Sequence, residues 1–299
     1  MDAAAAVEGW LFRSAGGRLI GFVKGCMHPL PELFAVPRVI EGRKTWSLGE
    51  ALRIASRLGD GFRVKPSPCL GGRKAGLVDP AAVELVAPWE AARRLRGCTT
   101  GLCRAALELL ETLASATRRG LVGVSGGLAY GAATAGDMDL VVYGPRDVER
   151  VYRLLGELRR EGVTSPAPPR GHGWSSSDVK LARSVQRGRL LIGIYRGYEY
   201  NVRLVHCIRP SRCGPIRLLG RARLEGVICG GTLYTLPVLY TLCLRGGGAA
   251  LVASWRLRYT ELPVGMHVDV AGEVEEWCGG LRVVVPDHGG YIRPAEGPG

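Results

Sequence analysis

The sequence predicts an α+β protein in which helices flank a mixed sheet and a small all-β barrel or sandwich follows toward the C-terminus. Three observations predict this fold class. Two short apolar runs bounded by glycine, at 121–124 and 140–143, have the composition of buried strands. Amphipathic helical periodicity spans 100–118 and 146–161, on either side of these runs. From about residue 208 the helical period disappears, and short apolar runs alternate with glycines.

The segment between the two apolar runs contains Gly126, Gly127 and Gly131, too much glycine for a long stable helix. It predicts a tight turn and one or two helical turns, where bare backbone can approach a ligand. The second run begins Asp137-Met138-Asp139. Residues i and i+2 of a strand share a face, so the sequence predicts that both carboxylates point one way and the apolar residues between them point into a core.

Two adjacent carboxylates at the start of a buried strand repel each other, and keeping both ionised is costly. A hard divalent cation removes that cost, and Mg²⁺ joining two carboxylates to substrate phosphates is a usual arrangement. Backbone N–H groups of the glycine turn would meet those phosphates. The alternative is a solvated Asp-x-Asp at the entry to a strand. The order of strand, double glycine, further glycine and strand favours the metal and phosphate site.

This segment resembles the signature of the DNA polymerase beta-type nucleotidyltransferase superfamily. The matching residues are Gly126-Gly127-Leu-Ala-Tyr-Gly131, followed by Asp137-Met-Asp139-Leu-Val-Val-Tyr-Gly. The resemblance implies a nucleotidyltransferase-like core that uses Mg²⁺ or Mn²⁺ and an NTP, with Asp137 and Asp139 as catalytic metal ligands. It also implies nucleotide contacts from Ser125, Gly126, Gly127 and Gly131. The sequence departs at Gly127, where the superfamily usually has the serine that contacts the triphosphate.

The N-terminal region strengthens the resemblance. Gly21-Phe-Val-Lys-Gly-Cys-Met-His28-Pro29 and Leu33-Phe34-Ala-Val36-Pro37 resemble the start of an uncharacterised archaeal family of predicted nucleotidyltransferases. The prolines exclude a regular helix, so His28 is expected on a rigid, extended loop. It could contact a phosphate or act as a general base. The favoured alternative is that it anchors the loop through backbone hydrogen bonds.

The run 198–205 predicts a strand on which Glu199, Asn201 and Arg203 share one face. It follows a strand at 190–195, and Arg196-Gly197 between them predicts a hairpin. The superfamily places its third metal-binding carboxylate on such a strand, which makes Glu199 the candidate for a third metal ligand and catalytic residue. A solvent-facing glutamate is the equal alternative. Arg203 could neutralise phosphate charge or pair with Glu199.

The remaining pattern predicts four regions. These are an N-terminal accessory α/β region at 1–97, the nucleotidyltransferase-like core at 98–207, a β-rich domain at 208–293 and a disordered tail at 294–299. Ser47 and Glu50 predict a capped helix over 47–58. Residues 61–80 are rich in proline, glycine and basic side chains and predict an extended loop, after which Asp79-Pro80 predicts a short helix. A second helix is expected at 88–96, and the segment 178–187 predicts another, after a loop that carries His172.

Composition limits the class of partner and compartment. The net charge is +13 and is carried mostly by arginine, which favours a nucleotide, RNA or DNA partner, unless arginine only reflects a GC-rich genome. No apolar run is long enough to cross a bilayer and no signal-peptide pattern is seen, so we expect a cytoplasmic protein without a membrane partner. Asn201 and Gln186 are the only side-chain amides, a tendency of thermophilic proteins.

The nine cysteines are an odd number, which argues against a complete disulfide framework. Cys98 and Cys103 are expected to be ordinary thiols, and a zinc site has little support. The sequence therefore predicts a Mg²⁺-dependent nucleotidyltransferase whose acceptor is RNA, a small molecule or a protein. The alternative is a nucleotide- or nucleic-acid-binding protein on the same fold without catalysis. A hydrolase is a third possibility, but no nucleophile and base in motif context support it.

Overall fold

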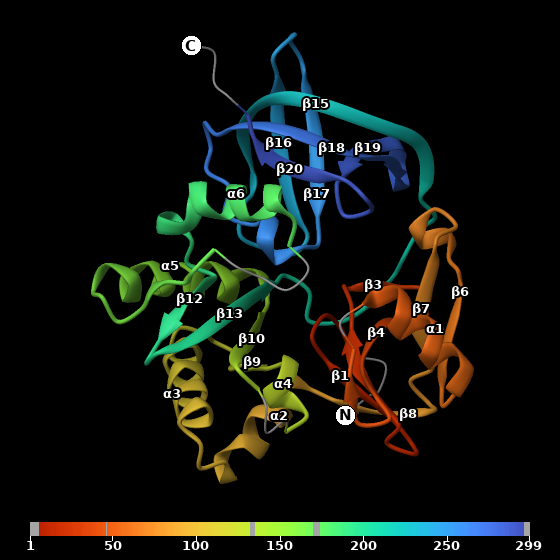
Figure 1. Ribbon diagram of the computed structural model, residues 1–299, viewed down its shortest axis with the longest axis vertical. Coiled ribbons are helices and arrows are strands. Elements are labelled where there is room, and N and C mark those ends of the chain that lie inside the picture. The colour runs from red at the N-terminus through yellow and green to blue at the C-terminus, as the bar shows by residue number, and fades with distance from the viewer. Residues whose placement is uncertain (1–5, 46, 132–134, 170–173, 296–299) are drawn as a thin grey trace. The chain divides into compact units, whose positions relative to one another are not determined.

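A computed structural model describes residues 6–45, 47–131, 135–169 and 174–295 of the 299-residue chain (Figure 1). The chain forms two compact units, and each is treated below by itself. The first comprises Met1–Ser165 and Leu191–Cys213, and the second comprises Pro166–Leu190 and Gly214–Gly299. The second unit is therefore made from two separate stretches of chain.

The fold class is mixed α+β, and six α-helices lie within the described residues. They are α1 (Leu48–Leu58), α2 (Pro88–Arg94), α3 (Gly101–Ser115), α4 (Gly126–Ala129), α5 (Pro145–Arg160) and α6 (Ser176–Val185). Ser47 begins α1 by accepting a hydrogen bond from the Glu50 amide, and Thr100 begins α3 in the same way through the Cys103 amide. The predictions of these two helices from capping residues and apolar period are confirmed.

The N-terminal sheet of the first unit has the strand order β6-β7-β4-β2-β1-β8, with β5 paired to β4. Its strands are β1 (Leu11–Ser14), β2 (Leu19–Val23), β4 (Leu33–Ile40), β5 (Arg43–Lys44), β6 (Phe62–Pro66), β7 (Lys74–Val78) and β8 (Val83–Val86). The predicted loop at 61–80 is wrong, because Phe62–Pro66 and Lys74–Val78 pair as a hairpin. The predicted helix at Asp79-Pro80 is also wrong, since the chain turns there and enters β8.

The central sheet of the first unit has the order β11-β12-β13-β10-β9. Its strands are β9 (Val122–Val124), β10 (Asp137–Tyr143), β11 (Ser165–Pro166), β12 (Ile192–Tyr195) and β13 (Tyr198–Val205). Strand β10 is parallel to β13 and antiparallel to β9, so the sheet is mixed as predicted. The hairpin at Arg196-Gly197 is also confirmed, with both residues at positive φ.

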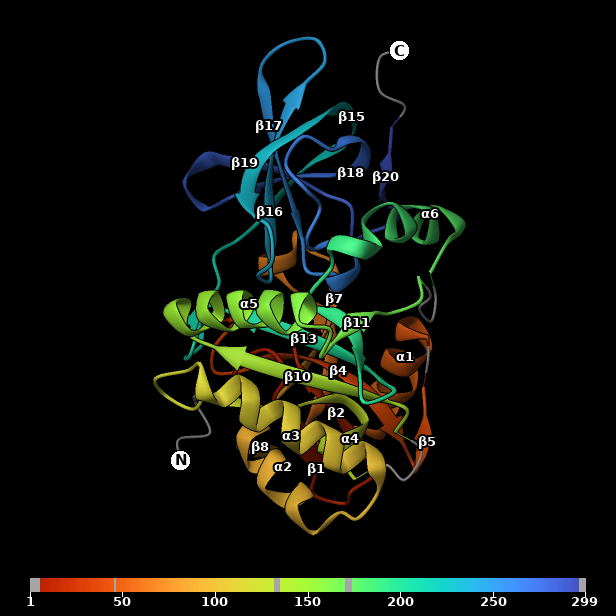
Figure 2. The ribbon, with the colours of Figure 1, turned by 90° about the vertical axis from the view of Figure 1, so that its left-hand side faces the viewer.

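Both faces of β10 are buried from Leu140 onward. Met138, Leu140 and Val142 are fully buried on the face that the helices cover, and α3 and α5 each contact the strand. Val141 and Tyr143 belong to the opposite face, where they share a core with residues of the N-terminal sheet. Figure 1 shows α3 and α5 to the left of β10 and the N-terminal strands to its right, and Figure 2 looks onto the helices, with the N-terminal strands behind β10. Only the start of β10 is left partly exposed.

Three disulfides lie in the first unit. Cys26–Cys207 and Cys69–Cys213 join the N-terminal sheet region to the chain that follows β13, across 181 and 144 residues of sequence. Beside them, β3 (Met27–His28) pairs in parallel with β14 (Ser211–Arg212). Cys98 and Cys103 form the third disulfide, so the prediction of two ordinary thiols there is wrong. Thr100 starts α3 between them, and the first helical turn returns Cys103 toward Cys98.

The second unit contains a near-closed ring of strands. They are β15 (Arg217–Thr232), β16 (Val238–Leu244), β17 (Ala249–Ser254), β18 (His267–Trp277), β19 (Leu281–Val285) and β20 (Tyr291–Pro294). The order β15-β16-β17-β19-β18 closes because β15 also pairs with β18, while β20 adds to β18. Strand β15 bends from one partner to the other near Gly226, where a side chain would overlap the carbonyl oxygen of Cys243. A fourth disulfide, Cys229–Cys243, joins β15 to β16.

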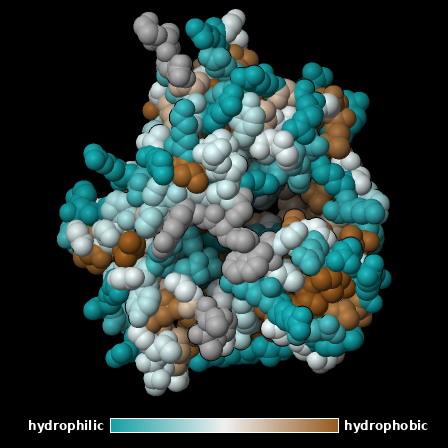
Figure 3. All heavy atoms as spheres, in the orientation of Figure 1, coloured by the Kyte–Doolittle hydropathy of each residue, from teal (hydrophilic) through white to brown (hydrophobic). Residues whose placement is uncertain are grey.

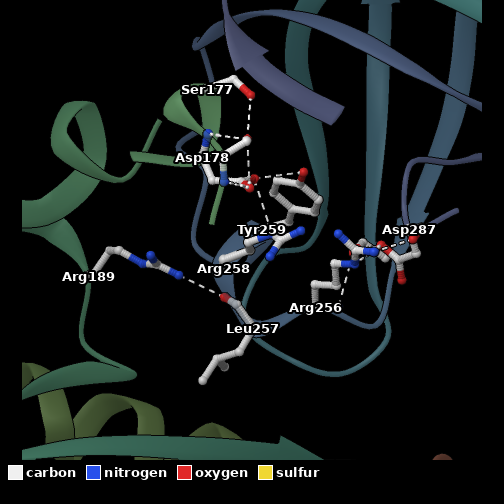
Figure 4. Close-up of polar contacts among 10 residues, drawn as sticks. Ser177, Asp178, Arg189, Arg256, Leu257, Arg258, Tyr259 and Asp287 are labelled. Carbon is white, nitrogen blue, oxygen red and sulfur yellow. Dashed lines mark hydrogen bonds and ion pairs between the residues drawn. The ribbon is translucent and has the colours of Figure 1, made fainter. Parts of the chain in front are cut away.

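Helix α6 packs on the ring through Leu181 and Val185, which belong to the same apolar core as the inward side chains of the strands. A polar network fixes the helix start (Figure 4). The Ser175 hydroxyl caps α6 by accepting from the Asp178 amide, and the Asp178 carboxylate accepts in return from the Ser175 amide. The same carboxylate accepts from the Tyr259 hydroxyl at 3.0 Å. Arg258 lies 3.1 Å from the same carboxylate. The short turn after β17 is thereby tied to α6.

Hydrophilic residues cover most of the face shown in Figure 3, and apolar residues form separate patches between them. In the described ranges, no helix is long and apolar enough to cross a membrane. The sequence around His172 and the end of the predicted tail at 296–299 lie outside the described residues.

Candidate functional site

The register of β10 on β13 brings the predicted acidic residues together. Asp137 is paired with Glu199, and Asp139 is paired with Asn201. Paired residues of adjacent strands share a face, so these four polar side chains emerge on one side of the sheet. All four are partly buried, whereas Met138 between the aspartates is fully buried on the other side.

Charge repulsion is strong at this position. Burial and the neighbouring Asp139 carboxylate raise the pKa of Asp137 to about 6, and Glu199 adds to the effect. The Asn201 side chain donates a hydrogen bond to Asp137 Oδ2 at 3.2 Å. Asn201 was placed on this face by the strand period, but nothing in the sequence identified it as a partner of Asp137. Lys44 attracts Asp137, but it does not offset the combined effect of burial and the Asp139 carboxylate on this pKa.

The glycine turn lies against the second aspartate. Gly126 has φ +57°, and a side chain there would overlap the Asp139 carboxylate. Ser125 precedes it, with its amide donating to the Asp139 carbonyl at 2.8 Å. The Ser125 hydroxyl is buried and donates to the Gly9 carbonyl at 3.1 Å, so its contact in this structure is with the N-terminal segment. Gly131 ends α4 at φ +76° with open space around it.

Arg203 is held by a carboxylate of the N-terminal segment. Its guanidinium lies 3.4 Å from Glu8 Oε1, and Lys24 lies 3.0 Å from the same oxygen. Burial opposes the charge of Glu8, but Lys24 and Arg203 more than offset it and the pKa of Glu8 is lowered. The Gly25 amide donates to the other oxygen at 2.7 Å. Arg203 therefore pairs with Glu8, a partner that the sequence did not indicate.

His28 lies on β3 and is fully buried. The Phe34 amide donates to its Nδ1 at 3.1 Å, which leaves the ring proton on Nε2. Burial lowers the pKa of His28 to about 4, so the imidazole is neutral near pH 7. The structure thus gives His28 a backbone hydrogen bond of the kind expected for a residue that anchors its loop.

Three side chains near the aspartates were not identified from the sequence. Lys44 attracts Asp137, and Arg38 attracts Asp139. Tyr130, at the end of α4, has its pKa raised by burial and by both aspartates. Arg38 and Lys44 belong to the β4–β5 hairpin, and only the folded sheet brings that hairpin to β10. No local spacing in the sequence could have connected them.

The donor set at β10 has the chemistry that Mg²⁺ prefers, namely carboxylate oxygens with room for waters and phosphates. Asp137, Asp139 and Glu199 do not gather as one tight triplet of ligand atoms. Across the described part of the chain, the only such group within 4.8 Å is Glu273, Glu275 and His288 of the second unit. The site at β10 therefore fits a cation held mainly by the two aspartates and completed by a ligand.

Comparisons with known proteins add little to this geometry. No protein-family model and no curated protein matches the chain. Among solved structures, the S. pombe Stn1–Ten1 complex is similar over 36% of this chain and 68% of the other chain, with 12% identity and a TM-score of 0.23. A likeness this weak carries no argument about fold or function.

Proposed function

We propose that this protein is a Mg²⁺-dependent nucleotidyltransferase that transfers a nucleotidyl group from an NTP to a hydroxyl acceptor. The observation that carries the proposal is the polar face at the start of β10. There the strand register aligns Asp137 with Glu199 and Asp139 with Asn201, and the bare Gly126 backbone lies against Asp139. The sequence motif and the local fold thus agree on one place where two carboxylates and a glycine turn meet.

In this proposal Asp137 and Asp139 hold the cation, and Asn201 orients Asp137 through its amide. The acceptor oxygen would form a bond to the α-phosphorus as the bond to the departing pyrophosphate breaks. A bound cation would activate the attacking hydroxyl and neutralise charge on the phosphates and on the pyrophosphate. The backbone of Gly126 and Gly127 would contact the phosphates. Glu199 lies in register with Asp137 and would add negative charge beside the cation, where it can accept the proton of an attacking hydroxyl. These roles require only side chains and backbone that face the open start of the strand.

The test compares the wild type with Asp137→Asn and Asp139→Asn in Mg²⁺-dependent binding and turnover of the four labelled NTPs. Total tRNA, small polyols and the protein itself serve as acceptors. Both variants should lose at least 100-fold in turnover, because each removes one charged ligand of the cation. The control is Asp60→Asn, which removes a carboxylate that pairs with Arg18 on the surface and should leave turnover unchanged. Equal turnover in all four proteins would refute the assignment.

A second candidate is nucleic-acid binding without catalysis. Two observations support it. Gly127 stands where the superfamily usually has a serine, and the ligand atoms of Asp137, Asp139 and Glu199 do not all lie within 4.8 Å of one another. The ring in the second unit also supports it. Its five strands close in the order β15-β16-β17-β19-β18, which by fold-level analogy resembles the Greek-key barrels that bind oligonucleotides. RNA binding by the wild type and both aspartate variants alike, with a strong salt dependence and no NTP binding, would favour this candidate.

A further inference from the structure

Arg38 occupies a β-bulge beside the candidate site. In the pairing of β2 with β4, Ile20 faces Val39 and Gly21 faces Pro37, so Arg38 is the extra residue of β4. A bulge redirects the side chain of its extra residue, and bulges are frequent next to functional sites. The strands approach closely here, since any side chain at Gly21 would overlap the carbonyl oxygen of Val36.

The backbone of Arg38 is held in place by the hairpin that follows. Its carbonyl accepts hydrogen bonds from both the amide and the hydroxyl of Thr45, at 2.8 and 3.2 Å. Lys44, the preceding residue, attracts Asp137, while Arg38 attracts Asp139. The hairpin therefore provides one cation for each of the two aspartates.

The guanidinium of Arg38 is partly buried but has no hydrogen bond or ion pair with any residue in the described ranges. Other arginines that are withdrawn from water have one. Arg203 pairs with Glu8 and Arg258 pairs with Asp178. The charged groups that act on Arg38 are the positive Arg203 and the negative Asp139. The hydrogen-bond donors of this guanidinium are therefore not used within the described part of the chain, and only its charge interacts with Asp139.

An anionic ligand would use the free donors of Arg38. We propose that Arg38 binds the phosphate oxygens of the nucleotide whose cation is held by Asp137 and Asp139. A planar guanidinium can donate two parallel hydrogen bonds to a phosphate, and it does so best where water is partly excluded. The cation would draw the phosphates toward the aspartates from one side, and Arg38 would hold them from the side of the N-terminal sheet. That sheet would then be part of the site and not only a support for it.

This inference rests on the proposed function, but it can be tested without turnover. The probe is Mg²⁺-pyrophosphate, and its affinity is measured by calorimetry for the wild type, Arg38→Ala and Arg38→Lys. Loss of a charged hydrogen-bonding partner is expected to weaken binding about 10- to 100-fold in Arg38→Ala. Arg38→Lys should recover part of the affinity, since it keeps the charge but not the paired donors. Arg43→Ala is the matched control, because Arg43 is an exposed residue of the same hairpin.

Mn²⁺ binding without pyrophosphate separates a phosphate contact from a structural role. If Arg38 binds phosphate, Arg38→Ala should bind Mn²⁺ as tightly as the wild type or more tightly, because the variant lacks a positive charge that repels the metal ion. Parallel loss of Mn²⁺ and pyrophosphate binding, or equal pyrophosphate binding by wild type and Arg38→Ala, would overturn the inference. If pyrophosphate binding depends on Arg38 while no NTP is turned over, the inference stands and the transferase proposal fails.

Discussion

At the scale of single residues, the least replaceable glycine of the site is Gly126. Gly126→Ala would place a methyl group on the Asp139 carboxylate and force a side chain into positive φ. We expect a loss of about 1–3 kcal/mol in the free energy of unfolding, together with weaker Mn²⁺ binding. Denaturant titration and calorimetry measure the two effects.

Gly131→Ala is the control for that substitution. It imposes a similar backbone conformation, at φ +76°, with nothing near the added methyl group. It should cost about 1 kcal/mol of stability and leave Mn²⁺ binding intact. If Gly126→Ala binds Mn²⁺ as well as Gly131→Ala does, the close contact with Asp139 has no functional role.

His28 should make the protein less stable in mild acid. Its pKa is about 4 when folded and near 6.5 when unfolded, so the unfolded chain binds the proton more readily. Its contribution is complete above pH 6.5 and is lost as the pH falls toward 4, by at most about 3 kcal/mol. His28→Asn keeps an acceptor for the Phe34 amide but does not titrate.

The measurement is the free energy of unfolding of the wild type and of His28→Asn at pH 7.5 and at pH 5. All other titratable groups are the same in the two proteins, so their pH dependence cancels in the comparison. We expect His28→Asn to be less stable than the wild type at pH 7.5, because the smaller side chain leaves space. The difference between the two proteins should shrink at pH 5. A difference that is constant with pH would show that His28 is not held neutral.

The sequence predicted part of the candidate site, and the missing part has a physical cause. Asp137 and Asp139 could be placed on one face because a strand has a side-chain period of two, whereas Glu199 was proposed from the resemblance to the nucleotidyltransferase superfamily. The places of Asn201 and Arg38 at the site could not be predicted, because Asn201 depends on the pairing of β10 with β13 and Arg38 on a bulge in a distant sheet. Glu8 was missed for the same reason, since it meets Arg203 across 195 residues.

At the scale of elements, the network at the start of α6 fixes the helix on the ring. Asp178 is 4% exposed. Its carboxylate accepts hydrogen bonds from the Ser175 amide and the Tyr259 hydroxyl and forms an ion pair with Arg258. Asp178→Ala leaves Arg258 without its counter-charge and removes the hydrogen bond that the carboxylate accepts from the Ser175 amide. We expect a loss of about 3–5 kcal/mol in stability, measured by denaturant unfolding.

Glu149→Ala on α5 is the comparison for Asp178→Ala. Glu149 also pairs with an arginine, Arg153, but both side chains are largely exposed. Its removal should change stability by no more than about 1 kcal/mol. Similar losses in the two variants would mean that the Asp178 network contributes no more than an ordinary surface pair.

Helices with clear caps were predictable from sequence, whereas the hairpin formed by β6 and β7 was not. Its segment contains Pro66, Pro68 and paired glycines, which normally interrupt strands. The structure places Pro66 at the end of β6 and the glycines in the connecting turn. Pairing with β4 then adds the hairpin to the N-terminal sheet, an effect of tertiary structure that local composition does not contain.

At the scale of the whole molecule, the long disulfides should dominate stability. Cys26–Cys207 closes a loop of 181 residues, so it restricts the unfolded chain strongly. Replacing both cysteines with serine should lower the free energy of unfolding by about 2–5 kcal/mol. Cys278→Ser is the control, because Cys278 is exposed and unpaired. Thiol titration of the unreduced, unfolded protein should find one free thiol, and nine would contradict all four bridges.

The polypeptide crosses between its two units three times, after Ser165, after Leu190 and after Cys213. No single cut can therefore yield both units whole. A fragment ending at Cys213 keeps α6 but exposes Leu181 and Val185, while a fragment starting at Gly214 has a ring without its helix. Gene fusion or deletion during evolution would meet the same obstacle, so we expect the two units to be inherited as one indivisible piece.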